Sequence, residues 1–253
     1  KDKESVTAIE SGIAAIDSVK YQQNSMTAII TADAKIDLSD LLPVFKETEN
    51  RFRVSTSISN ARLVSQSLQA FEAETGKVPS SVMISEHGKE YSWRIAILPF
   101  IGHQYIYDRY RFDEAWNSPN NLKVTESMPD FFGHPDDPKD STNSRMFFVV
   151  GNGTMFKNSL HSKSTSEIAD GASDTIMAVQ AKRDIHWAKP QDIEFDPTNL
   201  NFGGFGGDSY TVTLADGSVQ RISQNADQEE LTKALTPDGG EAIDSSKLFS
   251  GQK

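Results

Sequence analysis

The sequence predicts an α+β protein in which one long helix packs on an antiparallel sheet. Residues 38–75 carry apolar residues at helical spacing, as a core-facing helix does. Two runs rich in β-branched and aromatic residues flank Asp216 and Gly217, as in a β-hairpin. The other predicted strands are short and are joined by long loops, which favours an antiparallel sheet over the βαβ alternation of a parallel one.

The first 37 residues predict a helix followed by a β-hairpin. Residues 19–21 and 26–31 are the predicted strands, and the helix over 5–16 carries one apolar stripe: Val6, Ile9, Ile13 and Ile16. A helix and one hairpin cannot bury a core alone. We therefore interpret this unit either as the tail of a larger upstream α+β domain or as a unit that packs on the rest of the chain.

Residues 38–75 predict one long helix, with two helices that meet near Ser55 as the alternative. Asp37 or Ser39 can cap its start, and Pro43 suits a first turn, where a missing N–H loses no partner. Gly76 suits the position just after the helix. The stripe that faces the core is Ile58, Ala61, Val64, Leu68 and Phe71.

Short elements are expected between residues 76 and 201. The sequence predicts a hairpin about His87 and Gly88, a short helix over 93–101 broken at Pro99, and strands over 145–150 and 175–180. Residues 117–140 and 190–201 are expected to be irregular. A closing helix over 227–235 should start at Asp227, and the tail after Asp244 should be loose. The predicted domains are therefore 1–37, 38–244 and a tail, 245–253.

The Asp216-Gly217 turn predicts which residues of the two hairpin strands pair with each other. A two-residue Asp-Gly loop is typical of a type I′ turn, which would pair Leu214 with Val219. Thr211 and Thr213 would then point to the opposite face, which we expect to be solvated.

Several segments resemble one bacterial family in the same order along the chain. They are FEAETGKVP at 71–79, SWRIAILPFI at 92–101, AWNSP at 115–119, IADGASDTI at 168–176, WAKP at 187–190 and LADGSV at 214–219. Together they resemble the planctomycete-type H-X9-DG family, known as a pilin-like domain of unknown function and as solute-binding-protein-like. Asp216 and Gly217 match the signature, whereas Gly206 stands where the signature has histidine.

The resemblance implies a pilin-like fold, with the long helix as the spine on which the sheet packs. It also implies an extracytoplasmic protein of the periplasm or cell surface. An N-terminal export or membrane-anchoring segment is then expected to precede Lys1.

The glycine-rich run 203–207 precedes the first strand of the hairpin. Four glycines in five positions indicate positive φ angles or a close approach of another group. We expect this loop to close over Phe202 or Phe205, and Gly206, Asp216 and Gly217 to form a structural motif.

Composition excludes some classes of function. The chain has 25 Lys and Arg against 36 Asp and Glu, a net charge of −11, which argues against sequence-independent nucleic-acid binding. No stretch is long and apolar enough to span a bilayer. Because there is no cysteine, disulfides, thiolate nucleophiles and cysteine-based metal sites are excluded.

Two acidic loops are candidate calcium sites, because Ca²⁺ prefers hard oxygen ligands. The candidate ligands are Asp136, Asp137 and Asp140 in one loop, or Asp170 and Asp174 in the other. The alternative is that both are solvated turns in which an aspartate caps the next segment. No other cofactor is indicated.

Trp93, Trp116 and Trp187 are candidate ligand-binding residues, since tryptophans can line a carbohydrate or peptide groove. More often such side chains are buried in a core, where each covers a large apolar area.

Three functional hypotheses follow. The leading one is a non-enzymatic surface or envelope protein that acts through protein or glycan contacts. The second is a solute-binding module with a pocket near the glycine-rich loop and the tryptophans. The third is a hydrolase that uses carboxylates such as Asp136, Asp170 or Asp174. The sequence leaves the ligand, the partner and the oligomeric state open.

Overall fold

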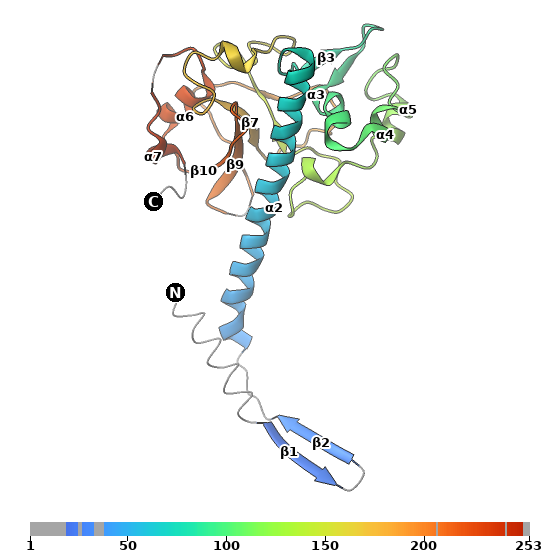
Figure 1. Ribbon diagram of the computed structural model, residues 1–253, viewed down its shortest axis with the longest axis vertical. Helices are drawn as coiled ribbons and strands as arrows, with labels where there is room; N and C mark the ends of the chain where they lie inside the picture. The colour runs from blue at the N-terminus through green and yellow to red at the C-terminus, as the bar shows by residue number, and fades with distance from the viewer. Residues whose placement is uncertain (1–18, 25–26, 33–37, 206, 241, 250–253) are drawn as a thin grey trace. The chain divides into compact units, whose positions relative to one another are not determined.

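The computed structural model describes residues 19–24, 27–32, 38–205, 207–240 and 242–249. The chain divides into two compact units, Lys1–Ser55 and Thr56–Lys253. The division falls within α2 (Leu38–Thr75), the blue-to-teal helix of Figure 1. The domain boundaries predicted at 37/38 and 244/245 remain predictions.

The smaller unit contains the predicted hairpin. Strand β1 (Val19–Asn24) pairs antiparallel with β2 (Thr27–Ala32), from Val19 opposite Ala32 to Asn24 opposite Thr27. Strand β1 extends three residues beyond the predicted 19–21, whereas β2 has the predicted length and is shifted by one residue from the predicted 26–31. The predicted helix over 5–16 lies outside the described residues.

Helix α2 is one continuous element, so the alternative of two helices that meet near Ser55 is wrong. Two i,i+4 ion pairs, Glu47 with Arg51 and Glu49 with Arg53, precede its Ser- and Thr-rich centre and favour the helix. The helix begins at Leu38, which places Pro43 beyond the first turn and not within it as predicted. Gly76 ends the helix as expected, with φ 81° and its N–H donated to the Glu72 carbonyl at 2.7 Å.

The larger unit is built on a four-stranded sheet in the order β10-β9-β7-β5. The strands are β5 (Met146–Phe147), β7 (Ile176–Gln180), β9 (Ser209–Leu214) and β10 (Val219–Ser223), and all neighbours are antiparallel. Figure 1 shows β7, β9 and β10 to one side of α2, together with α6 (Gln228–Leu235) and α7 (Ser245–Leu248). The α+β class with an N-terminal helix and antiparallel sheets is confirmed.

Two hydrophobic clusters cover the sheet. One contains Ala61, Val64 and Leu68 of α2 with Met177 and Ala178 of β7. The other contains Ile176 and Val179 of β7 with residues of α6 and α7, among them Leu231 and Leu248. Side chains on a strand alternate between faces, so both faces of this sheet are buried.

This two-sided burial overturns the prediction for the hairpin threonines. Thr211 and Thr213 are 2% and 0% exposed, because the face on which they lie is also covered. The predicted register is wrong as well. Val219 lies opposite Thr213, which leaves a three-residue loop of Ala215, Asp216 and Gly217.

The turn type explains the shifted register. Gly217 has φ 91°, whereas no described non-glycine residue has a positive φ, so Asp216 cannot adopt the type I′ conformation. The Gly217 N–H donates to the Leu214 carbonyl at 3.0 Å, and the Leu214 N–H donates to the Ser218 carbonyl at 2.9 Å. A tight turn followed by a left-handed glycine is the usual three-residue hairpin loop.

The remaining elements are short. The hairpin about Gly88 is confirmed by β3 (Val82–Ile84) and β4 (Glu90–Ser92), and α3 (Trp93–Ala96) gives way to the 3-10 turn η1 (Leu98–Ile101), which contains Pro99. The others are α4 (Gln104–Tyr107), α5 (Pro119–Val124), η2 (Asp130–Phe132), β6 (Val149–Val150), η3 (Thr165–Glu167) and β8 (Ile193–Glu194).

Three segments differ from the expectation. Residues 117–140 contain α5, because Ser118 caps it and Pro119 occupies its first turn. The strand predicted over 145–150 is split at Phe148, whose N–H donates to a side chain, Asp192, at 3.1 Å. Its second half, β6, pairs in parallel with β8, so the segment predicted to be irregular contributes a short strand.

The chain after Asp244 is ordered by α7. Leu248 and Phe249 are buried in the cluster that contains α6, so residues 245–249 do not form the loose tail that we expected. Apolar side chains at the end of a chain become ordered when they dock on a core. Asp227 caps α6 as predicted, since its carboxylate accepts from the Glu229 and Glu230 amides.

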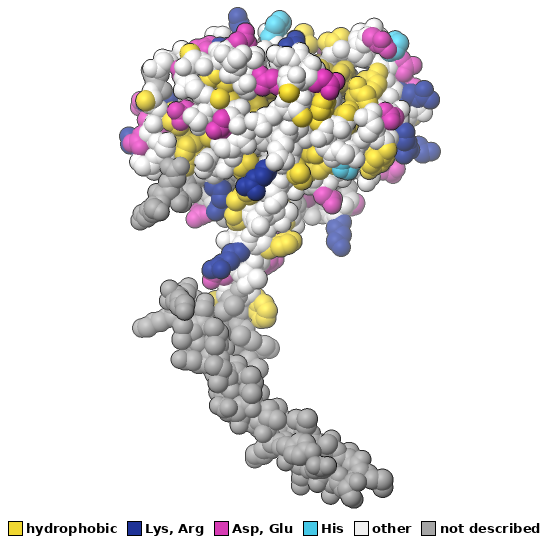
Figure 2. All heavy atoms as spheres, viewed as in Figure 1, with side chains coloured by type: hydrophobic (Ala, Val, Ile, Leu, Met, Phe, Trp, Pro, Cys, Tyr) yellow, Lys and Arg dark blue, Asp and Glu magenta, His cyan; other side chains and the backbone are white. Residues whose placement is uncertain are grey.

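The surface carries both signs of charge. Figure 2 shows acidic and basic side chains interspersed on the visible face, in keeping with a net charge of −11 made of 25 cationic and 36 anionic residues. Within the part of the chain that the structure describes, no helix combines the length and the apolar character needed to cross a membrane.

Candidate functional site

A pocket of about 160 Å³ opens beside the glycine-rich loop. Three segments that are separate in sequence form it: residues 198–202, the end of the β9–β10 hairpin, and α6. Its lining residues are Thr198, Asn199, Leu200, Asn201, Phe202, Tyr210, Ser223, Gln224, Gln228 and Leu231. The pocket therefore depends on the tertiary packing of all three segments.

The apolar part of the lining is anchored in the core. Leu200, Phe202, Tyr210 and Leu231 are each 5% exposed or less and belong to the cluster under α6. The Phe202 and Tyr210 rings lie 6.0 Å apart at 59°. Burial raises the pKa of the Tyr210 hydroxyl above its ordinary value, so this group stays neutral.

Gly203 allows these groups to come together. Its φ is 76°, and a Cβ at this position would lie 3.2 Å from the Tyr210 Cβ and 3.4 Å from the Gln224 Nε2. A larger residue would be strained by its backbone and would crowd two pocket residues. The close approach inferred from the glycine-rich run is thus found at Gly203.

The rim of the pocket is polar and uncharged. Asn199, Asn201, Gln224 and Gln228 contribute amides, and Thr198 and Ser223 contribute hydroxyls. Among the described residues, the side-chain amides of Asn199, Asn201 and Gln224 make no hydrogen bond to the protein. These amides can each donate and accept, so they are available to a ligand.

The backbone of the rim is held from outside the pocket. Arg183 donates to the Asn201 carbonyl at 2.6 Å, and the Gln224 N–H donates to the Asp208 carbonyl at 2.7 Å. Asp196 accepts from both the hydroxyl and the N–H of Thr198, at 2.6 and 2.9 Å, and these bonds lower the pKa of Asp196. The charged groups thus support the rim without lining it.

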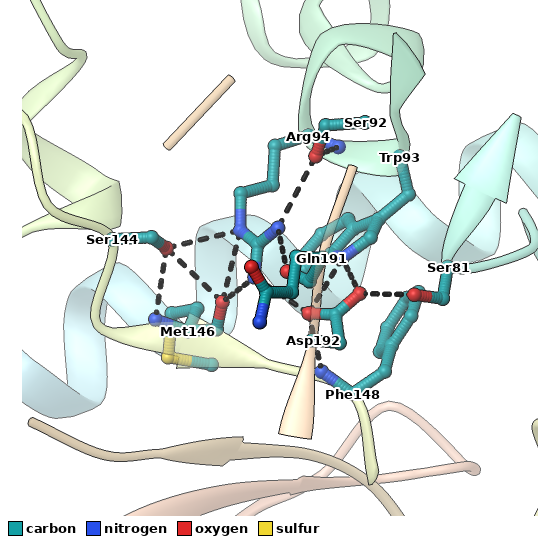
Figure 3. Close-up of polar contacts among 9 residues, drawn as sticks. All are labelled: Ser81, Ser92, Trp93, Arg94, Ser144, Met146, Phe148, Gln191 and Asp192. Carbon is teal, nitrogen blue, oxygen red and sulfur yellow. Dashed lines mark hydrogen bonds and ion pairs between the residues drawn. The ribbon is translucent and has the colours of Figure 1, made fainter. Parts of the chain in front are cut away.

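A buried ion pair fixes the chain just before this rim (Figure 3). Arg94 of α3 donates to Asp192 at 2.6 Å, and both side chains are fully buried. Asp192 also accepts from Ser81 at 2.6 Å, from the Trp93 indole at 3.0 Å and from the Phe148 N–H at 3.1 Å. The guanidinium reaches further oxygens, those of Ser92, Ser144, Met146 and Gln191.

This cluster is saturated with its own partners. Burial raises the pKa of Asp192 and lowers the pKa of Arg94, because desolvation disfavours both charged forms, while the ion pair opposes both shifts. Every polar group of the pair already has a protein partner, so the cluster is structural and offers no position for a substrate. Its effect is to join α3 and β5 to the residues directly before β3 and β8.

The tryptophans are not brought together around a groove. Trp93 and Trp187 are fully buried on either side of Phe132, with ring centroids 6.1 and 5.7 Å from it. The Trp187 indole donates to the Thr125 carbonyl at 2.9 Å. Trp116 is half-buried beside His186, 5.6 Å between centroids. Trp93 and Trp187 are therefore core residues and not ligand-binding ones, because packing covers both rings.

The acidic loops are occupied by protein contacts. Asp137 forms a two-oxygen ion pair with Arg145, 2.6–2.9 Å, and accepts from the His134 N–H. Asp170 accepts from the Gly240 N–H at 2.7 Å. Asp136 and Asp140 are exposed, and Asp174 is half-buried. Across the described residues, no group of three such side chains is placed to hold a metal ion.

The glycine-rich loop makes two aromatic contacts. Phe202 lies against Tyr210, and Phe205 stacks on His134 with centroids 3.9 Å apart at 15°. Gly206 lies outside the described residues, so its predicted part in the motif stays a prediction. Asp216 and Gly217 form the hairpin turn and contact α2, where Gln69 and Ser65 donate to their carbonyls at 2.9 and 3.0 Å.

Sequence reasoning missed most of the pocket. Its amides come from 199–201 and from 224–228, segments with no catalytic or cofactor motif. Asparagine and glutamine are common on surfaces, so their convergence has no signal in the sequence. The nearest signal was the glycine-rich run, which predicted a close approach without naming Tyr210 or Gln224.

The fold and the pocket define a class: an α+β domain with a small pocket lined by uncharged residues and a buried ion pair whose polar groups all have protein partners. A family model matches residues 53–208, which is more than half of the chain. The chain therefore belongs to the family described as a protein of unknown function (DUF1559), whose model is named SBP_bac_10. No curated protein and no solved structure matches the chain.

Proposed function

We propose that this protein is a non-enzymatic, extracytoplasmic binding protein, pilin-like in build, whose pocket takes one neutral, hydroxyl-rich group such as a sugar ring of a glycan. The observation that carries the proposal is the uncharged pocket lined by amides and hydroxyls over Phe202 and Tyr210. The solute-binding name of the family model agrees with a binding role.

The chemistry of the lining favours a polyol over an ion. Asparagine and glutamine side chains both donate and accept, which matches the hydroxyls of a sugar. The lining contains no charged residue to neutralise a phosphate or carboxylate, and the net charge of −11 repels anions at longer range.

The size of the pocket limits the ligand. A volume of about 160 Å³ is well below the roughly 300–1,000 Å³ of pockets for drug-sized molecules. It suits a single ring, as at the end of a glycan chain, and we expect weak binding. Extended contacts to a polymer would then supply additional affinity.

Titration with neutral monosaccharides, followed by amide NMR shifts, tests the pocket. We expect saturable shifts at Asn201, Gln224 and their neighbours, and a loss of affinity of about tenfold in Gln224→Ala, since one hydrogen bond is worth about 1 kcal/mol or more. Gln220→Ala is the matched control, because Gln220 lies on the same hairpin outside the pocket. Shifts that are absent with every neutral sugar, or that require a charged one, would contradict the proposal.

Cell fractionation tests the location. We expect the native protein in the envelope or surface fraction, accessible to a protease added to intact cells. Recovery in the cytosolic fraction, protected from that protease, would overturn the extracytoplasmic part of the proposal and leave the sugar titration unaffected.

A further inference from the structure

Two arginines join the pocket rim to the acidic loop, residues 134–140. The Asp137 carboxylate of this loop accepts from the Nε and Nη2 atoms of Arg145 at 2.6–2.9 Å. The remaining nitrogen of that guanidinium, Nη1, donates to the Arg183 carbonyl at 2.8 Å. The Arg183 side chain in turn donates to the Asn201 carbonyl at 2.6 Å. A continuous series of contacts therefore leads from a loop outside the pocket to a residue that lines it.

The acidic loop also holds the other end of the rim segment, residues 201–205. The His134 ring stacks on the ring of Phe205, with centroids 3.9 Å apart at 15°. Between the two ends, the N–H of Gly203 donates to the Gln180 carbonyl at the end of β7, at 3.0 Å. The rim segment is thus fixed at three points, and the acidic loop acts on the outer two.

The position of the rim segment matters, because it carries part of the pocket lining. Asn201 contributes an amide and Phe202 a buried ring. An added Cβ at Gly203 would lie only 3.2 Å from the Tyr210 Cβ, so the segment packs closely on the hairpin. Hydrogen bonds weaken steeply as their distance and angle depart from the preferred values. A displaced rim segment would therefore weaken binding without changing any group that a ligand touches.

The ion pair can hold its partners in a fixed geometry. The side chains of Asp137 and Arg145 are 8% and 4% exposed, so salt and water screen this pair less than an exposed one. A guanidinium that binds both oxygens of a carboxylate is fixed in orientation as well as in position. Its third nitrogen is then directed at the Arg183 carbonyl.

We propose that the acidic loop positions the binding pocket by fixing both ends of the rim segment. Asp137 acts on Asn201 through the two arginines, and His134 acts on Phe205 through its ring. Asp137 and His134 are positioning residues, since neither lines the pocket. The inference rests on the proposed function for what the pocket binds, whereas the coupling between loop and rim is a property of the chain itself.

Backbone NMR of the full chain tests the coupling without a ligand. We expect Asp137→Asn to shift the carbonyl carbon resonance of Asn201, and to speed exchange of the Gly203 N–H by about fivefold or more, because Arg145 is no longer held in place. Asp140→Asn is the matched control, since it removes the same charge from an exposed residue of the same loop and should change neither signal. Unchanged rim signals in folded Asp137→Asn would show that the proposal is wrong.

A second variant covers the case in which loss of the buried charge unfolds Asp137→Asn. Arg145→Lys keeps a cation opposite the Asp137 carboxylate, but a lysine ammonium lacks the rigid fork that reaches the Arg183 carbonyl at the same time. We expect the same changes at Asn201 and Gly203. Rim signals identical to those of the unmodified chain would also overturn the proposal.

Sugar affinity separates this inference from the proposed function. In a chain that binds a neutral monosaccharide, Asp137→Asn and Arg183→Lys should each weaken binding by about fivefold, which corresponds to about one hydrogen bond. Because the two residues act in series, the double variant should lose little more than either single variant, whereas independent defects would multiply. Multiplied losses, or affinities equal to that of the unmodified chain, would overturn the positioning role and leave the proposed function intact. If the unmodified chain binds no sugar, the proposed function fails and the NMR signals of the rim decide the positioning role.

Discussion

Asp192 links several segments of the larger unit through one buried carboxylate. Its carboxylate accepts hydrogen bonds from the Arg94 guanidinium and the Trp93 indole, both of α3, and from the N–H of Phe148, which lies between β5 and β6. A buried charge is tolerated when it is paired and fully hydrogen-bonded, and it becomes costly when one partner is removed.

Replacing Asp192 with Asn should destabilise the protein by about 3–5 kcal/mol, because Arg94 would remain buried without a counter-charge. Urea unfolding at neutral pH measures this loss. Asp196→Asn is the control, since that carboxylate is exposed and Asn keeps an oxygen to accept from Thr198. A loss below about 1 kcal/mol in Asp192→Asn would show that the pair can be relaxed or solvated.

At the scale of an element, the β9–β10 hairpin depends on the contact of its turn with α2. Gly217 combines a φ of 91° with a position where an added Cβ would meet the Gln69 side chain. Gly88, in the β3–β4 turn, has a comparable φ of 71° and no atom within 4 Å of an added Cβ. The two glycines therefore separate backbone strain from the loss of the helix contact.

Gly217→Val should cost more stability than Gly88→Val. Both changes carry about 1–3 kcal/mol of backbone strain. Gly217→Val also displaces Gln69 and breaks its bond to the Asp216 carbonyl, which adds about 0.5–1.5 kcal/mol. Thermal and urea unfolding of the two variants provide the comparison, and equal losses would mean that the contact with α2 contributes nothing.

Asp216→Asn is the conservative control for the same turn. The Asp216 carboxylate accepts from the Ser218 N–H at 2.8 Å, and an asparagine oxygen can do the same. We expect an almost unchanged stability. A binding activity lost in this variant at unchanged stability would instead assign the turn to a site.

At the scale of the whole molecule, the buried core belongs to the larger unit. Among the described residues, both hydrophobic clusters lie between Ala61 and Phe249, within Thr56–Lys253. A unit that contains its own core is expected to fold independently.

A fragment of residues 56–253 should therefore fold and unfold cooperatively, with a Tm close to that of the main transition of the full chain. Near-ultraviolet circular dichroism would report its native packing through Trp93 and Trp187, both fully buried. A fragment that lacks this signal, or that melts far below the full chain, would show that residues 1–55 contribute to the core.

Local patterns in the sequence predicted the elements whose causes are local. The apolar stripe of Ala61, Val64 and Leu68, together with Gly76, was enough to predict where α2 ends. The capping carboxylate of Asp227 was enough to predict where α6 starts. Helix periodicity and caps act within a few residues, so the sequence carries them directly. The α+β class followed from the order of these elements.

Tertiary structure decided what depends on distant neighbours. Thr213 is buried because packing covers both faces of the sheet, and Trp187 is buried in a core where its ring stacks on Phe132. No local sequence pattern records either contact. The pocket required Asn201, Gln224 and Leu231 to meet, although they come from a loop, a hairpin end and a helix. The sequence by itself determined where helices and strands form; their packing determined which face is buried and where polar groups converge, because burial is a property of the folded surface and not of any one segment.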